Sequence, residues 1–211
     1  MSKTKLIVLG IVAAIVIAII AVIGWGVSTR NSIVTYENNV DNTWANVQTS
    51  YQRRMDLIPN LVATVKGYAA HEKSTLTQVT AMRAGAVDKA GQELVAANNA
   101  AANPNGPDAA APDASRYQNL DRALSVYVNA VREAYPELMA NENFMDLQKQ
   151  LESTENRINT ERNRYNESVR AYNTYITRFP ANTIASMCGF TKKQFFQADA
   201  AAATAPTVSF E

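Results

Sequence analysis

Two residue patterns could support catalysis at a zinc ion or at a thiol. Adjacent His71 and Glu72 match the start of the His-Glu-x-x-His pattern, in which two histidines bind zinc and the glutamate acts as general base. That pattern needs a second histidine at the position of Thr75, and this chain contains a single histidine. Cys188, the single cysteine, could be a nucleophile with His71 as its base, but a lone cysteine is usually inert and buried. We therefore predict no catalytic residues, no metal site and no cofactor.

Two short segments with the densest charge offer the best candidates for a polar site. They contain Arg53, Arg54 and Asp56, and Glu155, Arg157, Glu161, Arg162 and Arg164. Glu161 falls on the apolar stripe of a predicted helix, where an unpaired carboxylate is strongly unfavourable. One hypothesis is an enzyme whose acid–base site contains Arg53, Asp56, Glu155 and Glu161, since burial can raise the pKa of one carboxylate of a pair. The alternative, which we favour, is an ion-pair network that fixes the register of the helices.

Several tyrosines could line a carbohydrate or quinone site. They are Tyr51, Tyr68, Tyr165, Tyr172 and Tyr175. The helical spacing of Tyr165 and Tyr172 instead favours core positions, with their hydroxyl groups reaching the edge of a bundle.

The charge distribution excludes a nucleic-acid partner. The chain has 20 basic and 19 acidic residues, but residues 1–30 contain Lys3, Lys5 and Arg30 and no acidic residue. Residues 31–211 therefore carry 17 basic and 19 acidic residues. A nucleic-acid-binding domain concentrates basic residues on one face, and this part of the chain has no basic excess.

A short basic N-terminus, residues 1–5, precedes a predicted transmembrane helix over residues 6–27. No charged residue occurs from Leu6 to Thr29. As a helix, residues 6–27 span roughly 33 Å, enough for a hydrocarbon core of about 30 Å. Trp25 lies at the end of the apolar run, where its ring suits the headgroup layer. A cleaved signal peptide is the alternative, but this run exceeds the usual length of a signal core.

The charges that flank this helix predict its orientation. Lys3, Lys5 and the terminal amine precede it, and only Arg30 follows closely. The positive-inside rule therefore places the N-terminus in the cytoplasm and the remaining domain outside, with the chain crossing the cell (inner) membrane once.

Residues 30–180 are predicted to form an antiparallel bundle of long helices, so that the fold is all-α. Apolar residues recur every three or four positions in three stretches. The stretches are Val40, Trp44, Val47, Tyr51, Met55, Ile58, Val62 and Val65; Leu120, Leu124, Tyr127, Val131 and Tyr135; and Phe144, Leu147, Leu151, Thr154, Ile158, Glu161, Tyr165, Val169, Tyr172 and Ile176. The first has one irregular step between Tyr51 and Met55. Pro59 is expected to kink that helix or to begin a new one.

Two further segments are predicted from composition. Residues 98–114 contain alanine and turn-forming residues but no large apolar side chain, which favours a mobile loop. Residues 181–211 form an aromatic C-terminal segment and tail, whose phenylalanines should either cap the chain's own bundle or contact a neighbouring subunit.

Long motifs at both ends of the domain resemble those of the LemA family of bacterial membrane-anchored proteins. They are NNVDNTWANVQ at 38–48, YQRRMDLIPNLVATVKGYAAHE at 51–72, ENRINTERNRYNESVRAYNTYITRFPAN at 155–182, GFTKKQFF at 189–196 and the ending PTVSF at 206–210. The resemblance covers nearly the whole chain except the alanine-rich loop. It implies a helical bundle behind an N-terminal transmembrane helix, and it implies no catalytic residues. Family descriptions often place the N-terminus outside the cell, opposite to the orientation that the charges predict.

The expected function is that of a non-enzymatic scaffold or adaptor. Members of the LemA family are commonly encoded beside membrane zinc proteases or other envelope proteins, so the resemblance implies such a protein as a partner. Besides the lipid bilayer, a second copy of the chain is the other expected partner. The predicted contact of this homo-oligomer uses Phe190, Phe195 and Phe196, together with Val208 and Phe210 of the tail.

Overall fold

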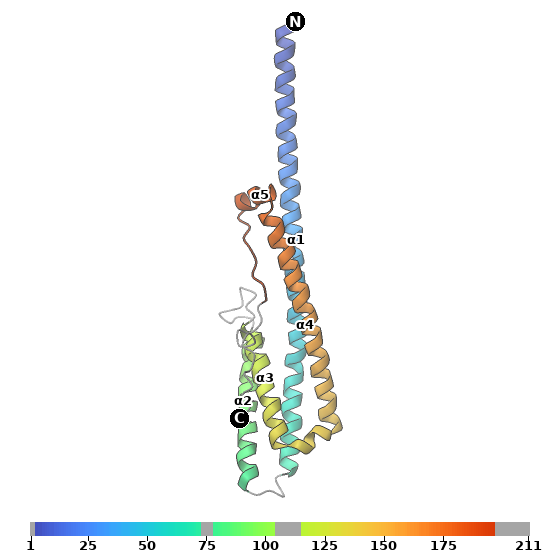
Figure 1. Ribbon diagram of the computed structural model, residues 1–211, viewed down its shortest axis with the longest axis vertical. Coiled ribbons are helices and arrows are strands. Elements are labelled where there is room, and N and C mark those ends of the chain that lie inside the picture. The colour runs from blue at the N-terminus through green and yellow to red at the C-terminus, as the bar shows by residue number, and fades with distance from the viewer. Residues whose placement is uncertain (1–2, 73–77, 104–114, 197–211) are drawn as a thin grey trace, which may run out of the picture. The chain divides into compact units, whose positions relative to one another are not determined.

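The computed structural model describes residues 3–72, 78–103 and 115–196, and within these residues all regular structure is helical. The helices are α1 (Lys3–Glu72), α2 (Gln78–Ala102), α3 (Ser115–Ala134), the short 3-10 helix η2 (Pro136–Ala140), α4 (Glu142–Thr177) and α5 (Ala181–Cys188) (Figure 1). The predicted all-α fold is confirmed. The chain divides into two compact units, Met1–Thr43 with Asn166–Phe195, and Trp44–Tyr165 with Phe196–Glu211.

The first unit contains the predicted transmembrane segment. Among the described residues, one helix is long and apolar enough to cross a membrane, and its apolar window has no buried residue. Beyond this segment, Ile33 and Val40 of α1 and Val169, Tyr172 and Ile176 of α4 are buried. The Thr43 and Ser168 hydroxyl groups are hydrogen-bonded at 2.8 Å, and the rings of Tyr36 and Tyr175 lie 4.9 Å apart. The apolar stripes of α1 and α4 therefore meet here as the periodicity predicts.

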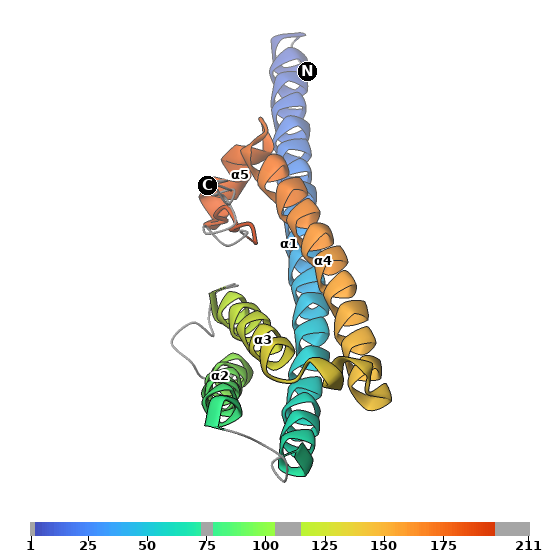
Figure 2. The ribbon, with the colours of Figure 1, turned by 60° about the horizontal axis from the view of Figure 1, so that its bottom comes forward.

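The second unit is a bundle of four helical segments. The parts of α1 and α4 in this unit run antiparallel to each other, and α2 packs against α3 (Figure 1, Figure 2). Its core combines apolar residues from all four helices. They include Val47, Ile58, Leu61 and Val65 of α1, Val87 and Leu94 of α2, Leu120, Tyr127 and Val131 of α3, and Phe144, Ile158 and Tyr165 of α4.

The structure decides two sequence expectations in this unit. Pro59 was expected to kink its helix or to begin a new one, and because α1 continues through it, the second alternative is excluded. Burial of Ile58 and Leu61 on either side stabilises the helix at a position where proline removes one backbone hydrogen bond. Residues 98–102, predicted as the start of a mobile loop, form the end of α2. Asn103 follows α2, and residues 104–114 of that predicted loop lie outside the described residues.

The aromatic C-terminal segment has separate environments for its phenylalanines. Phe195 is exposed and Phe190 is half-buried, whereas Phe196 is buried in the second unit. The ring of Phe196 lies 6.3 Å from that of Trp44 and 4.5 Å from the guanidinium carbon of Arg162. Phe196 therefore packs within its own chain, and its buried ring offers almost no surface for a contact with another subunit. Val208 and Phe210 lie outside the described residues.

Two glycines of α2 provide a matched test of the packing between α2 and α3. A Cβ atom at Gly85 would meet nothing within 4 Å, whereas one at Gly91 would lie 3.2 Å from Cε2 of the buried Tyr127. We expect Gly85→Ala to stabilise the fold by about 0.5–1 kcal/mol, because alanine favours the helix. Gly91→Ala should be less stable than Gly85→Ala by about 1–2 kcal/mol, because the tyrosine ring must shift. Urea unfolding of the full chain in detergent measures both, and equal stabilities would contradict the close approach.

Candidate functional site

A buried arginine occupies the middle of the apolar stripe of α1. The side chain of Arg54 is 2% exposed, and it continues the series Val47, Tyr51, Ile58, Leu61 and Val65, all of which are buried. With Arg54 included, the spacing alternates regularly between four and three residues. The apolar residues alone leave an irregular step between Tyr51 and Met55. The buried residue that restores the regular spacing there is the charged Arg54.

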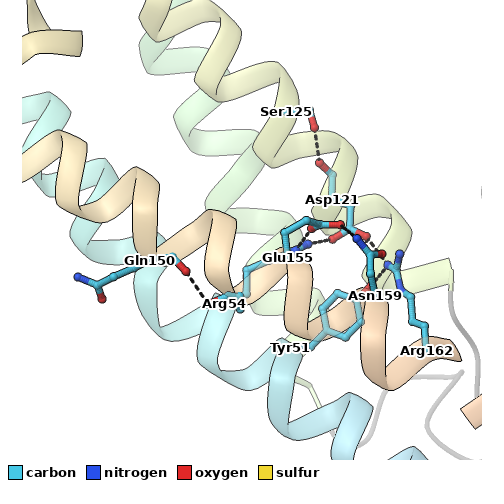
Figure 3. A network of polar contacts seen from close by, with 9 residues as sticks. Tyr51, Arg54, Asp121, Ser125, Gln150, Glu155, Asn159 and Arg162 are labelled. Carbon is cyan, nitrogen blue, oxygen red and sulfur yellow. Dashed lines mark hydrogen bonds and ion pairs between the residues drawn. The ribbon is translucent and has the colours of Figure 1, made fainter. Parts of the chain in front are cut away.

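The guanidinium group of Arg54 joins α1 to two other helices. It donates one hydrogen bond to Oδ1 of Asp121 on α3 and another to Oε2 of Glu155 on α4. Figure 3 shows the side chains of these three residues meeting. A planar arginine can hold two carboxylates at once, whereas a lysine would present a single point of charge.

A second arginine completes the network around Asp121. Arg162 of α4 donates to Oδ2 of Asp121 at 2.6 Å and to the hydroxyl group of Tyr51. That hydroxyl group in turn donates to Oδ2 of Asp121 at 3.1 Å. Asn159 donates to the other oxygen of Glu155, Oε1, at 3.0 Å (Figure 3). We call these residues, Tyr51, Arg54, Asp121, Glu155, Asn159 and Arg162, the polar cluster.

Two aromatic rings lie against the arginines of the polar cluster. The ring of Tyr51 stacks on that of Tyr117 with centroids 4.0 Å apart. The guanidinium carbons of Arg54 and Arg162 lie 5.5 and 5.3 Å from the Tyr51 ring centroid. Cations near aromatic faces are attracted by the ring quadrupole, more strongly where water is excluded. The rings therefore stabilise the two buried cations beyond what the carboxylates provide.

Burial shifts the ionisation of the polar cluster. It raises the pKa of Asp121 to about 6, against the opposing attraction of Arg54. It also lowers the pKa values of Arg54 and Arg162 from their usual range. All three shifts favour the neutral form, because charged groups lose hydration in the core. At neutral pH Asp121 is still ionised and pairs with both arginines.

The shift at Asp121 predicts how stability depends on pH. Because its folded-state pKa of about 6 lies above the ordinary value of 3.8, the folded chain binds a proton between these pH values that the unfolded chain does not. The free energy of unfolding of the wild type, relative to Asp121→Asn, should therefore rise by up to about 3 kcal/mol as the pH falls from about 7 to about 4. Unfolding at several pH values measures it. The exposed Asp146, replaced by Asn, is the control for a carboxylate outside the core.

The four residues of the predicted acid–base site do not converge. Arg53 is exposed, and Asp56 accepts a hydrogen bond from Gln52 at 2.8 Å. Glu161 is buried and pairs with Arg164 at 2.9 Å, while its Oε2 atom has no partner among the described residues. Only Glu155 belongs to the polar cluster. The ion pairs of the favoured hypothesis are present, and two of its candidate residues, Arg54 and Arg162, are the cations.

Sequence reasoning missed Asp121. It follows Leu120 of the α3 stripe by one residue, so helical periodicity places it at the edge of the core rather than on the surface. This position beside the apolar stripe is the sequence signal from which a partly buried Asp121 could have been predicted. Cys188 is exposed, whereas a lone cysteine was expected to be buried, and the side chain of Glu72 lies outside the described ones. In the described part of the chain, no three His, Cys, Asp or Glu residues could hold a metal ion together.

A groove lies over the polar cluster between α3 and α4. Its volume is about 460 Å³. One wall is lined by Leu124, Ser125, Val128 and Asn129 of α3, the other by Gln148, Leu151, Glu152 and Glu155 of α4, and Arg54 of α1 also lines it. The two helical walls of the groove thus carry both apolar and polar side chains, and the charged groups at its base, Arg54 and Glu155, are already paired.

The features described so far define a membrane protein with an N-terminal apolar helix and an all-helical bundle. Comparison with known proteins gives its family: a model of the LemA family matches residues 43–210, and the chain belongs to that family. The resemblance drawn from the sequence motifs is confirmed.

Similar curated proteins include three magnetosome proteins. MamQ 1 and MamQ 2 of Paramagnetospirillum magneticum (strain ATCC 700264 / AMB-1) are each 27% identical over 189 residues, which cover 86% of this chain and 70% of the relative. MamQ of Magnetospirillum gryphiswaldense (strain DSM 6361 / JCM 21280 / NBRC 15271 / MSR-1) is 25% identical over 188 residues, covering 86% and 69% respectively.

Proposed function

We propose that the protein is a membrane-anchored scaffold or adaptor of the bacterial envelope, which acts through protein–protein contacts and catalyses no reaction. The observation that carries this proposal is the groove between α3 and α4, whose charged floor is already neutralised by its own ion pairs. A binding groove needs shape and a mixture of apolar and polar side chains, whereas a catalytic cleft needs a reactive group that is free. The names of the MamQ relatives state no reaction either.

The groove suits a segment of another protein chain. Leu124, Val128 and Leu151 supply apolar surface, and Asn129, Gln148 and Glu152 supply hydrogen-bonding groups along the same walls. Amphipathic helices commonly bind in grooves of this composition between two helices. The partners that we propose are a second copy of the chain and an envelope protein such as a membrane zinc protease.

Site-specific photo-crosslinking in the native cell tests this proposal. A photoreactive amino acid replaces Val128, which lines the groove, or Val126, a 50% exposed residue of the same helix that does not line it. We expect adducts from position 128 that are absent from position 126. An adduct of twice the chain's mass would identify self-assembly, and another mass would identify a different partner. Equal adducts, or none, at the two positions would contradict the proposal.

The second candidate, an enzyme, draws on one observation: Glu155 is 46% exposed at the groove beside Arg54. A carboxylate that acts as a general base needs a free oxygen within reach of the substrate. Both oxygens of Glu155 accept hydrogen bonds, one from Arg54 and the other from Asn159. The geometry therefore supports the scaffold better than the enzyme.

The orientation that we propose places residues 31–211 outside the cytoplasm, with the chain in the inner membrane. The two lysines before the transmembrane helix support it, since only Arg30 follows closely. Alkaline phosphatase fused after Glu211 should be active in this orientation. A fluorescent protein that folds only in the cytosol, fused at the same position, should stay dark.

A further inference from the structure

α5 lies beside the membrane end of α1. A Cβ atom at Gly26 would be 3.6 Å from Cδ1 of Ile184, so the two helices are in close proximity there (Figure 1). Gly26 follows Ile23, the last residue of the continuous apolar run, by about 5 Å along the helix axis. The headgroup layer on each side of a bilayer is roughly 5–8 Å thick. Ile184 is therefore, like Gly26, at the level of the headgroups.

Two large apolar side chains close to Ile184 in the sequence are strongly exposed. Phe179 is 80% and Met187 is 79% exposed, larger fractions than those of any other large apolar residue among the described side chains. The opposite face of α5 is packed, with Ala181 and Ala185 buried. The exposed side of α5 carries Met187 beside the polar Asn182, Thr183 and Ser186, and Phe179 stands exposed just before the helix.

The chain holds α5 and the following residues in place. Gly189 ends α5 with a left-handed backbone (φ 76°), and the amide of Phe190 donates to the carbonyl of Ala185 at 3.0 Å. The side chain of Asn173 on α4 makes two hydrogen bonds of 2.9 Å with the backbone of Lys193. Lys193 also pairs with Glu37 of α1 at 2.8 Å. Hydrogen bonds and an ion pair therefore hold the backbone of α5 and of the residues that follow it against α4 and α1.

The charges around α5 complement an anionic surface. Residues 179–191 contain no charged residue, and the exposed Arg178 and Lys192 stand at the two ends of this segment. No acidic residue occurs between Glu167 and Asp199. Exposed large apolar side chains between basic residues are typical of segments that lie in the membrane interface, where anionic lipids attract the basic side chains.

We propose that α5 and Phe179 insert into the headgroup layer of the phospholipid bilayer, as a second membrane contact beside the transmembrane helix. Phe179 and Met187 reach toward the acyl chains, while Arg178 and Lys192 bind lipid phosphates. The two contacts together fix the tilt and the rotation of α1 relative to the membrane, which a single span leaves free. The inference does not depend on the scaffold function.

The exposed single cysteine next to Met187 makes this proposal testable in the intact protein. A nitroxide label is attached to Cys188 of the full chain in vesicles of phosphatidylcholine and phosphatidylglycerol. Its collisions with oxygen, which concentrates in lipid, are compared with those with a water-soluble nickel complex. Ile15→Cys and Asn38→Cys, each made together with Cys188→Ser, calibrate the hydrocarbon core and the water. We expect the Cys188 label to fall between these references, at the depth of the headgroups.

Removing the inserted side chains should move the label toward water. In the double variant Phe179→Ala, Met187→Ala the accessibility ratio should approach that of Asn38→Cys, whereas the exposed Val126→Ala in α3 should leave it unchanged. Circular dichroism confirms that the variants keep their helices. A Cys188 label in the wild type as accessible to nickel as Asn38→Cys would overturn the proposal. Protection from both reagents with spin–spin broadening would also overturn it, because a second copy would then cover α5.

Discussion

Replacing Arg54 by alanine is expected to lower the free energy of unfolding by about 3–5 kcal/mol, because it removes the buried cation that joins Asp121 to Glu155 and leaves Asp121 with Arg162 alone. Arg54 is 2% exposed and donates to carboxylates on two other helices. The neighbouring Arg53 is exposed, and Arg53→Ala should change stability by less than about 0.5 kcal/mol. The two variants remove the same charge one residue apart, so they separate the effect of the network from that of net charge.

Urea unfolding of the full chain in detergent, followed by circular dichroism, measures this difference. Arg54→Lys keeps the charge but cannot hold Asp121 and Glu155 in the same way, so it should recover only part of the loss. Similar losses for Arg53→Ala and Arg54→Ala would show that the buried network does not hold the three helices together.

Replacing both Ile15 and Ile19 by lysine is expected to abolish stable membrane insertion. Both isoleucines are exposed on the apolar part of α1, and a lysine near the centre of a spanning helix costs about 2.5–3.5 kcal/mol. Two lysines therefore oppose insertion by about 5–7 kcal/mol, comparable to the whole gain from this single apolar run. The control, Ile15→Leu with Ile19→Leu, keeps the hydrophobicity and should stay in the membrane.

Alkaline extraction of membranes gives the readout. The wild type and the leucine variant should remain in the membrane pellet, and the lysine variant should not. The mass of the wild-type protein from the pellet distinguishes a retained anchor from a signal peptide. A pelleted protein that lacks residues 1–24 would contradict the retained helix.

The sequence alone determined the features that depend on neighbouring residues. A helix satisfies its backbone hydrogen bonds within itself, so the three-and-four spacing of buried residues in α1, α3 and α4 was visible without a partner. The apolar run from Leu6 to Ile23 likewise predicts its membrane character by length and composition alone. The family resemblance rested on contiguous motifs for the same reason.

The helix α2 and its boundary were harder to predict, because α2 presents many small side chains. Ala90, Gly91 and Ala101 are buried along it, but such residues give a weak periodic signal. What makes this stretch a core helix is its close approach to α3, where Gly91 meets Tyr127. The extension of α2 through residues 98–102 has the same tertiary origin.

Only the tertiary structure decided which charges meet. Arg53 and Arg54 are neighbours with the same chemistry, but Arg54 is buried on the stripe from Tyr51 to Ile58 and Arg53 is exposed. Its partners Asp121 and Glu155 lie on two other helices, far away in the sequence. Side-chain pairing between helices depends on where their faces cross, which no local pattern encodes. For that reason the sequence predicted a network of ion pairs, whereas the tertiary structure determined which residues form them.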